Sequence, residues 1–275
     1  VLHLLYARFW TKVLADAGLL PFREPFIRLK NQGQLLGLDG HRMSKSRGNT
    51  ITPDSMVEQY GADALRIYSL FMAPFDQDIA WSTEGIIGAQ RFLNRVWKLY
   101  QDTYDDSEMA QREDIDLLCA THRMIHQVSE RIDGFRFNTV ISALMEFISL
   151  LDWYHRTGSW HTVTFHRALD TFLILLAPVA PHITEELWRL TGHGDSVHQQ
   201  MWPKYDPALA QEDAVELPIQ VDGKVRDVIV VPTHANQSEV ELQVKESSKV
   251  QQCVADRRIV KIIYVPGKIF SIVTG

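Results

Sequence analysis

The stretch that decides the fold is Arg42-Met43-Ser44-Lys45-Ser46-Arg47-Gly48-Asn49. Three cationic side chains and two hydroxyls follow one another closely and end at a glycine. Phosphate oxygens are bound by charged donors, hydroxyls and closely approaching backbone amides. This pattern indicates an anion-binding loop. From charge and glycine alone, however, a solvated basic loop that connects a strand to a helix is the favoured interpretation.

Short elements are predicted on both sides of this loop. Apolar residues recur at helical spacing over Val1–Ala17, and Gly18 is a plausible C-cap. Asp39-Gly40 is a hairpin turn signal, and Thr52-Pro53 is typical of a helix start. Strands are predicted at Phe26–Leu29 and Gln34–Gly37, and a third helix is predicted at Ala64–Phe71.

The chain changes character from Ser82 onward. Apolar residues recur at helical spacing in four or five long segments, which predicts an antiparallel helical bundle. Pro178 and Pro181 interrupt this pattern, and Thr184 is a candidate N-cap for the helix that follows. Gly192–Asp213 is predicted to be a linker. A strand–strand–helix–strand–strand unit is then predicted from Leu217–Val221, Val225–Val231, Ser238–Val254 with Ser238 as N-cap, Ile259–Val265 and Lys268–Val273.

Bulk properties narrow the class of protein. With 275 residues and 45% hydrophobic residues, the chain has the composition of a multidomain globular protein without a membrane-spanning run. Its two cysteines, Cys119 and Cys253, have no metal-ligand spacing, which fits a reducing, cytoplasmic compartment. The formal net charge of −6 argues against a protein that simply coats nucleic acid. Because Val1 opens inside a helical pattern, we expect a fragment, a processed product or one subunit of a split protein.

Arg42–Ser46 resembles the Lys-Met-Ser-Lys-Ser signature of the class I aminoacyl-tRNA synthetases, with arginine at the first position. The resemblance implies a mobile loop, Arg42, Met43, Ser44, Lys45 and Ser46, that binds ATP, with Mg²⁺ accompanying this substrate. It makes Lys45 the catalytic residue that stabilises the pyrophosphate leaving group. It also implies that Gln32-Gly33-Gln34 meets the adenine, and that Asp63 and Arg66 of the Tyr60–Arg66 motif are structural.

Further segments are similar to the leucyl-tRNA synthetases within this class. His3–Phe9 resembles the segment that lines the amino-acid pocket, which implies a place for His3 beside the leucine side chain. Gly88–Trp97 resembles the first bundle helix. The remaining matching segments are Arg136–Thr139, Ala177–His182, Ser196–His198 with Trp202-Pro203, Gln220–Arg226 and Tyr264–Lys268.

The resemblance implies three parts: the end of a Rossmann-like catalytic domain at residues 1–81, a helical anticodon-binding-type bundle with a linker at 82–212, and a small α/β domain at 213–275. The fold is thus predicted to be multidomain and mainly α. The bundle and the small domain would contact tRNA. For each candidate phosphate contact, a solvated surface charge is an equally open interpretation. The candidates are Lys224, Arg226, Lys261 and Lys268 in the small domain, and Arg91, Arg95 and Arg136 in the bundle.

We expect no metal bound by this chain, because His122 and His126 lack a third ligand nearby in the sequence. The second class I signature, His-Ile-Gly-His, is absent, as are the segments of an editing domain. We therefore expect the chain to need an N-terminal catalytic and editing portion, in the same chain or a separate subunit, and to form no leucyl-adenylate alone. The alternatives are a free-standing tRNA-binding module, the small subunit of a split synthetase, and a relative specific for valine, isoleucine or methionine.

Overall fold

The computed structural model describes residues 2–103, 113–211, 214–232, 235–254 and 257–275. These residues divide into two compact units, the first from residues 1–118 with 124–204 and the second from residues 119–123 with 205–275. The chain is mainly helical with a small sheet, as predicted. No helix among the described residues is both long enough and apolar enough to cross a membrane.

The first unit begins with the predicted helix α1, Leu2–Asp16, and Gly18, two residues after its end, has a positive φ of 75°. Strand β1, Leu35–Leu36, pairs in parallel with β2, Ile79–Ala80. The prediction of a strand at Phe26–Leu29 is wrong. Its apolar side chains are exposed, and none of its backbone groups joins a ladder in the described part of the chain.

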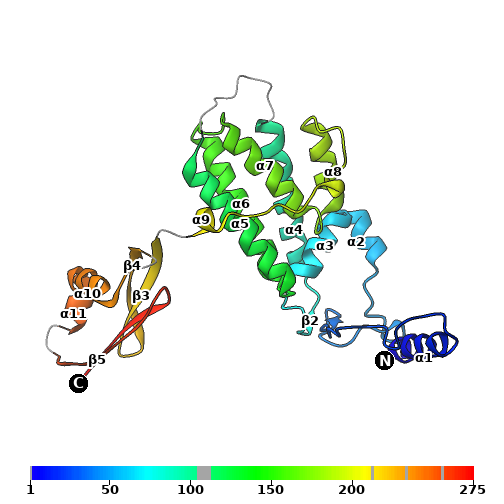
Figure 1. Ribbon diagram of the computed structural model, residues 1–275, viewed down its shortest axis with the longest axis horizontal. Helices are drawn as coiled ribbons and strands as arrows, with labels where there is room; N and C mark the ends of the chain where they lie inside the picture. The colour runs from blue at the N-terminus through cyan, green and yellow to red at the C-terminus, as the bar shows by residue number, and fades with distance from the viewer. Residues whose placement is uncertain (1, 104–112, 212–213, 233–234, 255–256) are drawn as a thin grey trace. The chain divides into compact units, whose positions relative to one another are not determined.

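The signature stretch lies between β1 and two helices that follow in sequence (Figure 1). Lys45–Arg47 forms the short 3₁₀-helix η1. Helix α2, Pro53–Tyr60, begins where Thr52-Pro53 predicts it. Helix α3, Ala62–Phe71, begins two residues before the predicted start at Ala64. Proline is favoured at the start of α2 because the first turn of a helix leaves its N–H groups unbonded in any case.

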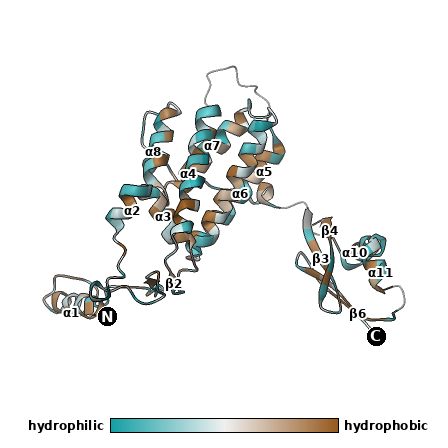
Figure 2. Ribbon diagram, turned by 180° about the vertical axis from the view of Figure 1, so that it is seen from behind, coloured by the Kyte–Doolittle hydropathy of each residue, from teal (hydrophilic) through white to brown (hydrophobic). Residues whose placement is uncertain are grey.

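The predicted bundle is present, and its long helices have one hydrophobic and one hydrophilic face (Figure 2). Its core contains fully buried Leu144, Phe165 and Phe172. Tyr100 is buried too and donates a hydrogen bond of 2.6 Å to the carbonyl of Leu169, and burial raises the pKa of this phenol well above its usual value. The bundle helices are α4 Thr83–Thr103, α5 Ile115–Asp133, α6 Phe137–Arg156, α7 Val163–Leu176 and α8 Pro181–Leu190.

The prediction of Thr184 as an N-cap is wrong. Helix α8 begins one turn earlier, at Pro181, and the buried Thr184 hydroxyl donates 2.8 Å to the carbonyl of Ala180 inside the helix. The predicted linker contains two short helices, η2 Val197–Gln199 and α9 Pro207–Ala210, and its last two residues lie outside the described ones.

The second unit is a four-stranded sheet in the order β4-β3-β6-β5, with its two helices on one face. The outer pairs are antiparallel hairpins, and the central pair β3–β6 is parallel. The predicted single helix is two helices that break at Ser247, and the N-cap is Asn236 rather than Ser238, in a capping box with Glu239. The elements are β3 Ala214–Val221, β4 Lys224–Pro232, α10 Gln237–Glu246, α11 Ser248–Val254, β5 Ile259–Val265 and β6 Ile269–Thr274.

Candidate active-site loop and its attachment

The loop at residues 37–49 is held by side-chain hydrogen bonds rather than by an apolar core. The Asn49 Oδ1 accepts from the Ser44 amide at 2.8 Å, and its Nδ2 donates to the Asp39 carboxylate at 3.1 Å and to the Arg42 carbonyl at 3.3 Å. Asp39 also accepts from the His41 amide at 3.1 Å. These donors hold the pKa of Asp39 below its usual value, the His41 amide contributing most.

Asn49 and Asp39 were not singled out as site residues from the sequence. The available signals were the Asp39-Gly40 turn and the Gly48-Asn49 end of the loop, because short polar side chains bond nearby backbone groups in turns. The predicted turn is present, with Gly40 at a positive φ of 70° and an antiparallel bridge from Leu36 to Arg42.

The network leaves the cations of the loop free. Arg42, Lys45 and Arg47 are exposed, and none forms an ion pair with a described residue. The hydroxyls of Ser44 and Ser46 lie 2.7 Å apart and bond each other. The loop therefore presents exposed positive charge and two hydroxyls on a backbone that the hydrogen bonds of Asn49 hold in place.

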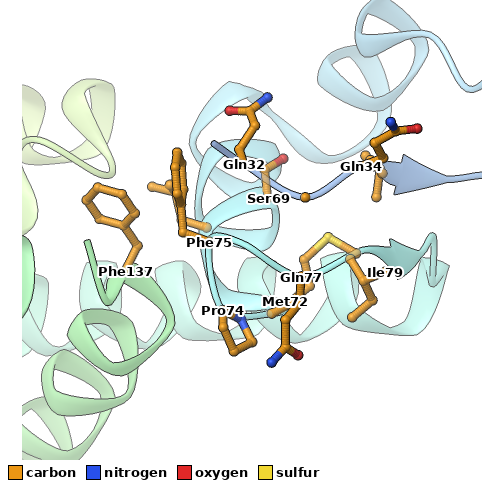
Figure 3. A pocket seen from close by; sticks show the side chains of 13 residues that line it. Gln32, Gln34, Ser69, Met72, Pro74, Phe75, Gln77, Ile79 and Phe137 are labelled. Carbon is orange, nitrogen blue, oxygen red and sulfur yellow. The ribbon is translucent and has the colours of Figure 1, made fainter. Parts of the chain in front are cut away.

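A cavity of about 300 Å³ lies beside the predicted adenine-binding segment (Figure 3). Gln32, Gly33 and Gln34 form part of its lining, together with Phe75 and Phe137. Gly33 is required by the backbone path, because its amide donates to the Phe75 carbonyl at 2.9 Å and a Cβ there would lie 1.8 Å from the Gln77 carbonyl oxygen. The glycine thus lets two backbone segments touch at the wall of the cavity.

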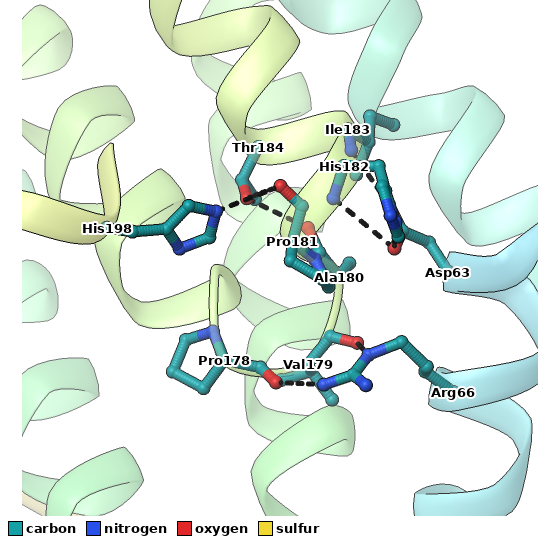
Figure 4. Close-up of polar contacts among 10 residues, drawn as sticks. All are labelled: Asp63, Arg66, Pro178, Val179, Ala180, Pro181, His182, Ile183, Thr184 and His198. Carbon is teal, nitrogen blue, oxygen red and sulfur yellow. Dashed lines mark hydrogen bonds and ion pairs between the residues drawn. The ribbon is translucent and has the colours of Figure 1, made fainter. Parts of the chain in front are cut away.

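Helix α3 attaches the loop segment to the bundle through two side chains one turn apart (Figure 4). The carboxylate of Asp63, only 8% exposed, accepts from the Ile183 amide at 2.7 Å and from the His182 ring Nδ1 at 2.8 Å. Arg66 donates to the carbonyls of Pro178 at 2.8 Å and Val179 at 3.1 Å.

This attachment satisfies the ends of two bundle helices at once. The first amides of α8 have no hydrogen-bond partner within their own helix, and the Asp63 carboxylate accepts a hydrogen bond there. Arg66 donates hydrogen bonds to carbonyls just beyond the end of α7. Negative charge at a helix start and positive charge at a helix end are both favourable. The pair has the structural function that the Tyr60–Arg66 motif predicts.

The remaining predicted site residues lie on separate elements. His3 is exposed in the first turn of α1. Arg91 and Arg95 of α4 line a cavity of about 480 Å³ with residues of α6, and Arg95 is ion-paired to Asp152. Arg136 precedes α6 and bonds Glu130 at 2.7 Å. In the second unit, Lys224, Arg226 and Lys261 lie toward one end of the sheet and Lys268 toward the other.

The chain matches two family models. Residues 6–82 match the class I tRNA synthetases (I, L, M and V), and residues 114–243 match the anticodon-binding domain of tRNA ligase. It is 44% identical over 99% of its length to a leucine–tRNA ligase of Herpetosiphon aurantiacus, and 41% identical over 99% to one of Deinococcus radiodurans. The chain belongs to the leucine–tRNA ligase family of class I tRNA synthetases. It spans 33% of the length of each of these two leucine–tRNA ligases.

Solved structures agree with this family. All of the chain aligns with 37% of the agnB2 LeuRS of Agrobacterium radiobacter K84, solved as a ternary LeuRS-tRNA-LeuAMS complex, with a TM-score of 0.76 and 32% identity. A methionyl-tRNA synthetase of Mycobacterium tuberculosis shares the fold over 68% of this chain and 41% of its own, with a TM-score of 0.52 and 21% identity. Within the described residues, no group of three His, Cys, Asp or Glu could hold a metal ion.

Proposed function

We propose that this chain works within an enzyme that attaches leucine to its tRNA with ATP, and that Arg42–Ser46 binds the triphosphate. The observation that carries the proposal is the loop itself. Its free, exposed cations stand on a backbone fixed by Asn49 and Asp39. Charged donors placed where negative charge develops lower a transition state more than they stabilise the ground state.

In this proposal Lys45 donates to the pyrophosphate oxygens as the bond between the α- and β-phosphates breaks. Lysine suits this task because its charge sits on a flexible stem that can follow the leaving group. Arg42 would bind the phosphates as a planar fork, and Ser44 and Ser46 would donate their hydroxyls; Met43, the remaining residue of the loop signature, is half-buried. Mg²⁺ would enter with ATP and offset part of its charge.

The chain, in our proposal, divides into three parts. We assign residues 1–81 to the end of a Rossmann-like catalytic domain, 82–212 to the bundle and its linker, and 213–275 to a small tRNA-binding domain. His3 would line the leucine pocket.

Helix α1 would contact a further catalytic and editing portion. Its exposed apolar side chains support this contact, because Leu2, Phe9 and Trp10 are each at least 58% exposed. Large apolar side chains in such numbers mark an interaction surface.

The tRNA contacts are proposed for both units, by Arg91, Arg95 and Arg136 in the bundle and by Lys224, Arg226, Lys261 and Lys268 in the small domain. We do not favour a free-standing tRNA-binding module, because the leucine–tRNA ligase relatives extend far beyond the region that aligns with this chain. We propose that the 275 residues alone do not catalyse ATP–pyrophosphate exchange.

The test is Lys45→Ala in the full-length ligase that contains this chain. We expect leucine-dependent ATP–pyrophosphate exchange to fall by about 10²–10³-fold in kcat, since one transition-state donor contributes about 3–4 kcal/mol. Lys98→Ala on the exposed face of α4 is the matched control and should retain exchange. Equal rates for Lys45→Ala and the control would refute the proposal.

A further inference from the structure

An aromatic residue occupies a strained backbone position at the turn between α5 and α6. Phe135 has a positive φ of 58° and is one of two non-glycine residues with such a φ in the described part of the chain. Its amide donates to the Ile132 carbonyl at 3.0 Å, and the next amide, of Arg136, donates to the Arg131 carbonyl at 2.8 Å. These two bonds form a Schellman motif, in which glycine usually takes the left-handed position because a Cβ is unfavourable there. Gly134 stands one residue too early, with an ordinary φ of −78°.

The Phe135 ring contacts both the bundle and the segments that lead to the signature loop. It packs edge-to-face on Phe75, with ring centroids 5.5 Å apart, and on Phe137 of α6, at 5.6 Å. Phe75 and Phe137 also meet edge-to-face at 5.8 Å, and Figure 3 shows these two rings beside each other. The ammonium of Lys30 lies over the Phe135 ring, 5.1 Å from its centre. Because both geometries are attractive, the contacts of the ring compensate for the backbone strain.

Two of these partners determine the path of the segment Gln32–Gln34. Lys30 lies two residues before this segment in the sequence. The Phe75 carbonyl accepts from the amide of its central glycine, Gly33, at 2.9 Å. The contact continues at Gln34, whose carbonyl accepts from the Ile79 amide at 3.0 Å. The position of the segment therefore depends on where the aromatic rings hold Phe75 and Lys30.

The same segment continues into the signature loop. Strand β1 follows Gln34 directly and pairs with β2. Leu36 of this strand forms an antiparallel bridge with Arg42, the first residue of the signature. The loop has no apolar core of its own to resist displacement, and such segments move at low free-energy cost. A shift of Gln32–Gln34 would therefore displace β1 and, through the bridge, the cation of Arg42.

We infer that Phe135 is a positioning residue for ATP, whose ring holds Gln32–Gln34, and through β1 the signature loop, in a fixed place on the bundle. The inference rests on the proposed function, in which the loop binds the triphosphate, and it names the residue that supports the loop. The ring itself touches no substrate in this proposal. Its effect is on ATP rather than on leucine, because the contacts lead to the loop, whereas the proposed leucine-pocket residue His3 lies on α1.

Three substitutions at this one position separate the ring from the strain. Phe135→Gly removes the ring and relieves the strained φ, Phe135→Ala removes the ring and keeps the strain, and Phe135→Tyr keeps the ring. ATP–pyrophosphate exchange is measured in the full-length ligase that contains this chain, with ATP and leucine varied in turn. We expect Phe135→Gly and Phe135→Ala to raise KM for ATP equally, by about 5-fold or more, because a binding-competent loop is populated less often. KM for leucine, and both constants of Phe135→Tyr, should change less than about 2-fold.

Thermal unfolding of the 275-residue chain distinguishes positioning from loss of structure. Phe135→Ala should unfold at a lower temperature than Phe135→Gly, because alanine keeps the strained φ. A purely structural role would make Phe135→Ala the more defective enzyme. It would also lower kcat rather than raise KM, since unfolded molecules bind no ATP. Equal KM values in two variants of unequal stability are the result expected of a positioning residue.

A second site tests the path through Phe75. Phe75→Leu keeps an apolar side chain but removes the edge-to-face contacts with Phe135 and Phe137. The double variant with Phe135→Gly should raise KM for ATP no more than about 2-fold beyond the larger single effect, because both changes break the same connection. Independent effects would multiply instead.

Four results would overturn the inference. An unchanged KM for ATP in Phe135→Gly, while the unmodified ligase exchanges normally, would show that the ring supports no ATP contact and would leave the proposed function intact. Multiplying effects in the double variant would place Phe75 outside the path. A loss of kcat alone, larger for Phe135→Ala than for Phe135→Gly, would assign Phe135 a purely structural role. Absence of exchange in the unmodified ligase would refute the proposed function itself, and the inference with it.

Discussion

The signature loop and the helical bundle are stabilised in different ways, although they belong to one unit. The bundle excludes water from Phe172, Leu144 and their neighbours. The loop buries almost nothing and depends on Asn49 and Asp39. The difference shows how one chain combines a rigid support with a region that can change conformation, since segments with few buried apolar contacts open at low free-energy cost.

The largest effect should come from the bundle core. Phe172→Ala removes a fully buried ring and is expected to lower the free energy of unfolding by about 3–5 kcal/mol. Phe26→Ala removes the same side chain from the segment between α1 and β1 that leads to the loop, where it is 55% exposed, and should change stability by less than about 0.5 kcal/mol. Urea unfolding measures both, and similar losses would contradict the contrast between the two regions.

A smaller effect is expected where the two regions meet. Asp63→Ala leaves the first amides of α8 without their acceptor, which should cost about 2 kcal/mol in urea unfolding. Asp54→Ala removes an exposed carboxylate from the first turn of α2 and serves as the control, with an expected loss under about 0.5 kcal/mol. If Asp63→Ala were as stable as the control, α3 would not attach the loop segment to the bundle.

Within the loop, Asn49→Ala should act locally. The substitution removes the acceptor of the Ser44 amide and a donor to Asp39. We expect this loss to lower the local free energy of opening of the loop by about 1 kcal/mol. Amide exchange at Ser44 should then quicken by roughly 5-fold, while exchange in α6 is unchanged. Thr50→Ala, in an exposed neighbour, is the control. Faster exchange throughout the bundle would show that the loop and the bundle open together.

The smallest expected effect is a pH dependence confined to the loop. The folded pKa of Asp39 is lowered, so its contribution is complete above the unfolded value of about 4 and is lost as the pH falls through the folded value. Nuclear magnetic resonance of the Ser44 amide should therefore report loosening below about pH 4, before the bundle signals change. Asp39→Asn should remove this transition. An unchanged transition in that variant would exclude Asp39 as its source.

The sequence by itself determined the helices of the bundle, the turn at Asp39-Gly40 and the position of the loop with its cations, because helical periodicity and turn chemistry act over a few residues. The long-range partners are of another kind. Nothing in the spacing of Asp63 indicates that Ile183, 120 residues later, donates to it.

Tertiary structure alone decided three features. It placed the start of α8 at Pro181, one turn before the predicted cap at Thr184, where the carboxylate of distant Asp63 accepts from the Ile183 amide of the first turn. It split the predicted helix at Ser247, which bonds Asp227 of β4. It also paired β3 with β6, which brought Lys261 to the same end of the sheet as Lys224 and separated both from Lys268. Each feature depends on contacts between residues far apart in the chain, and local sequence preferences do not encode such contacts.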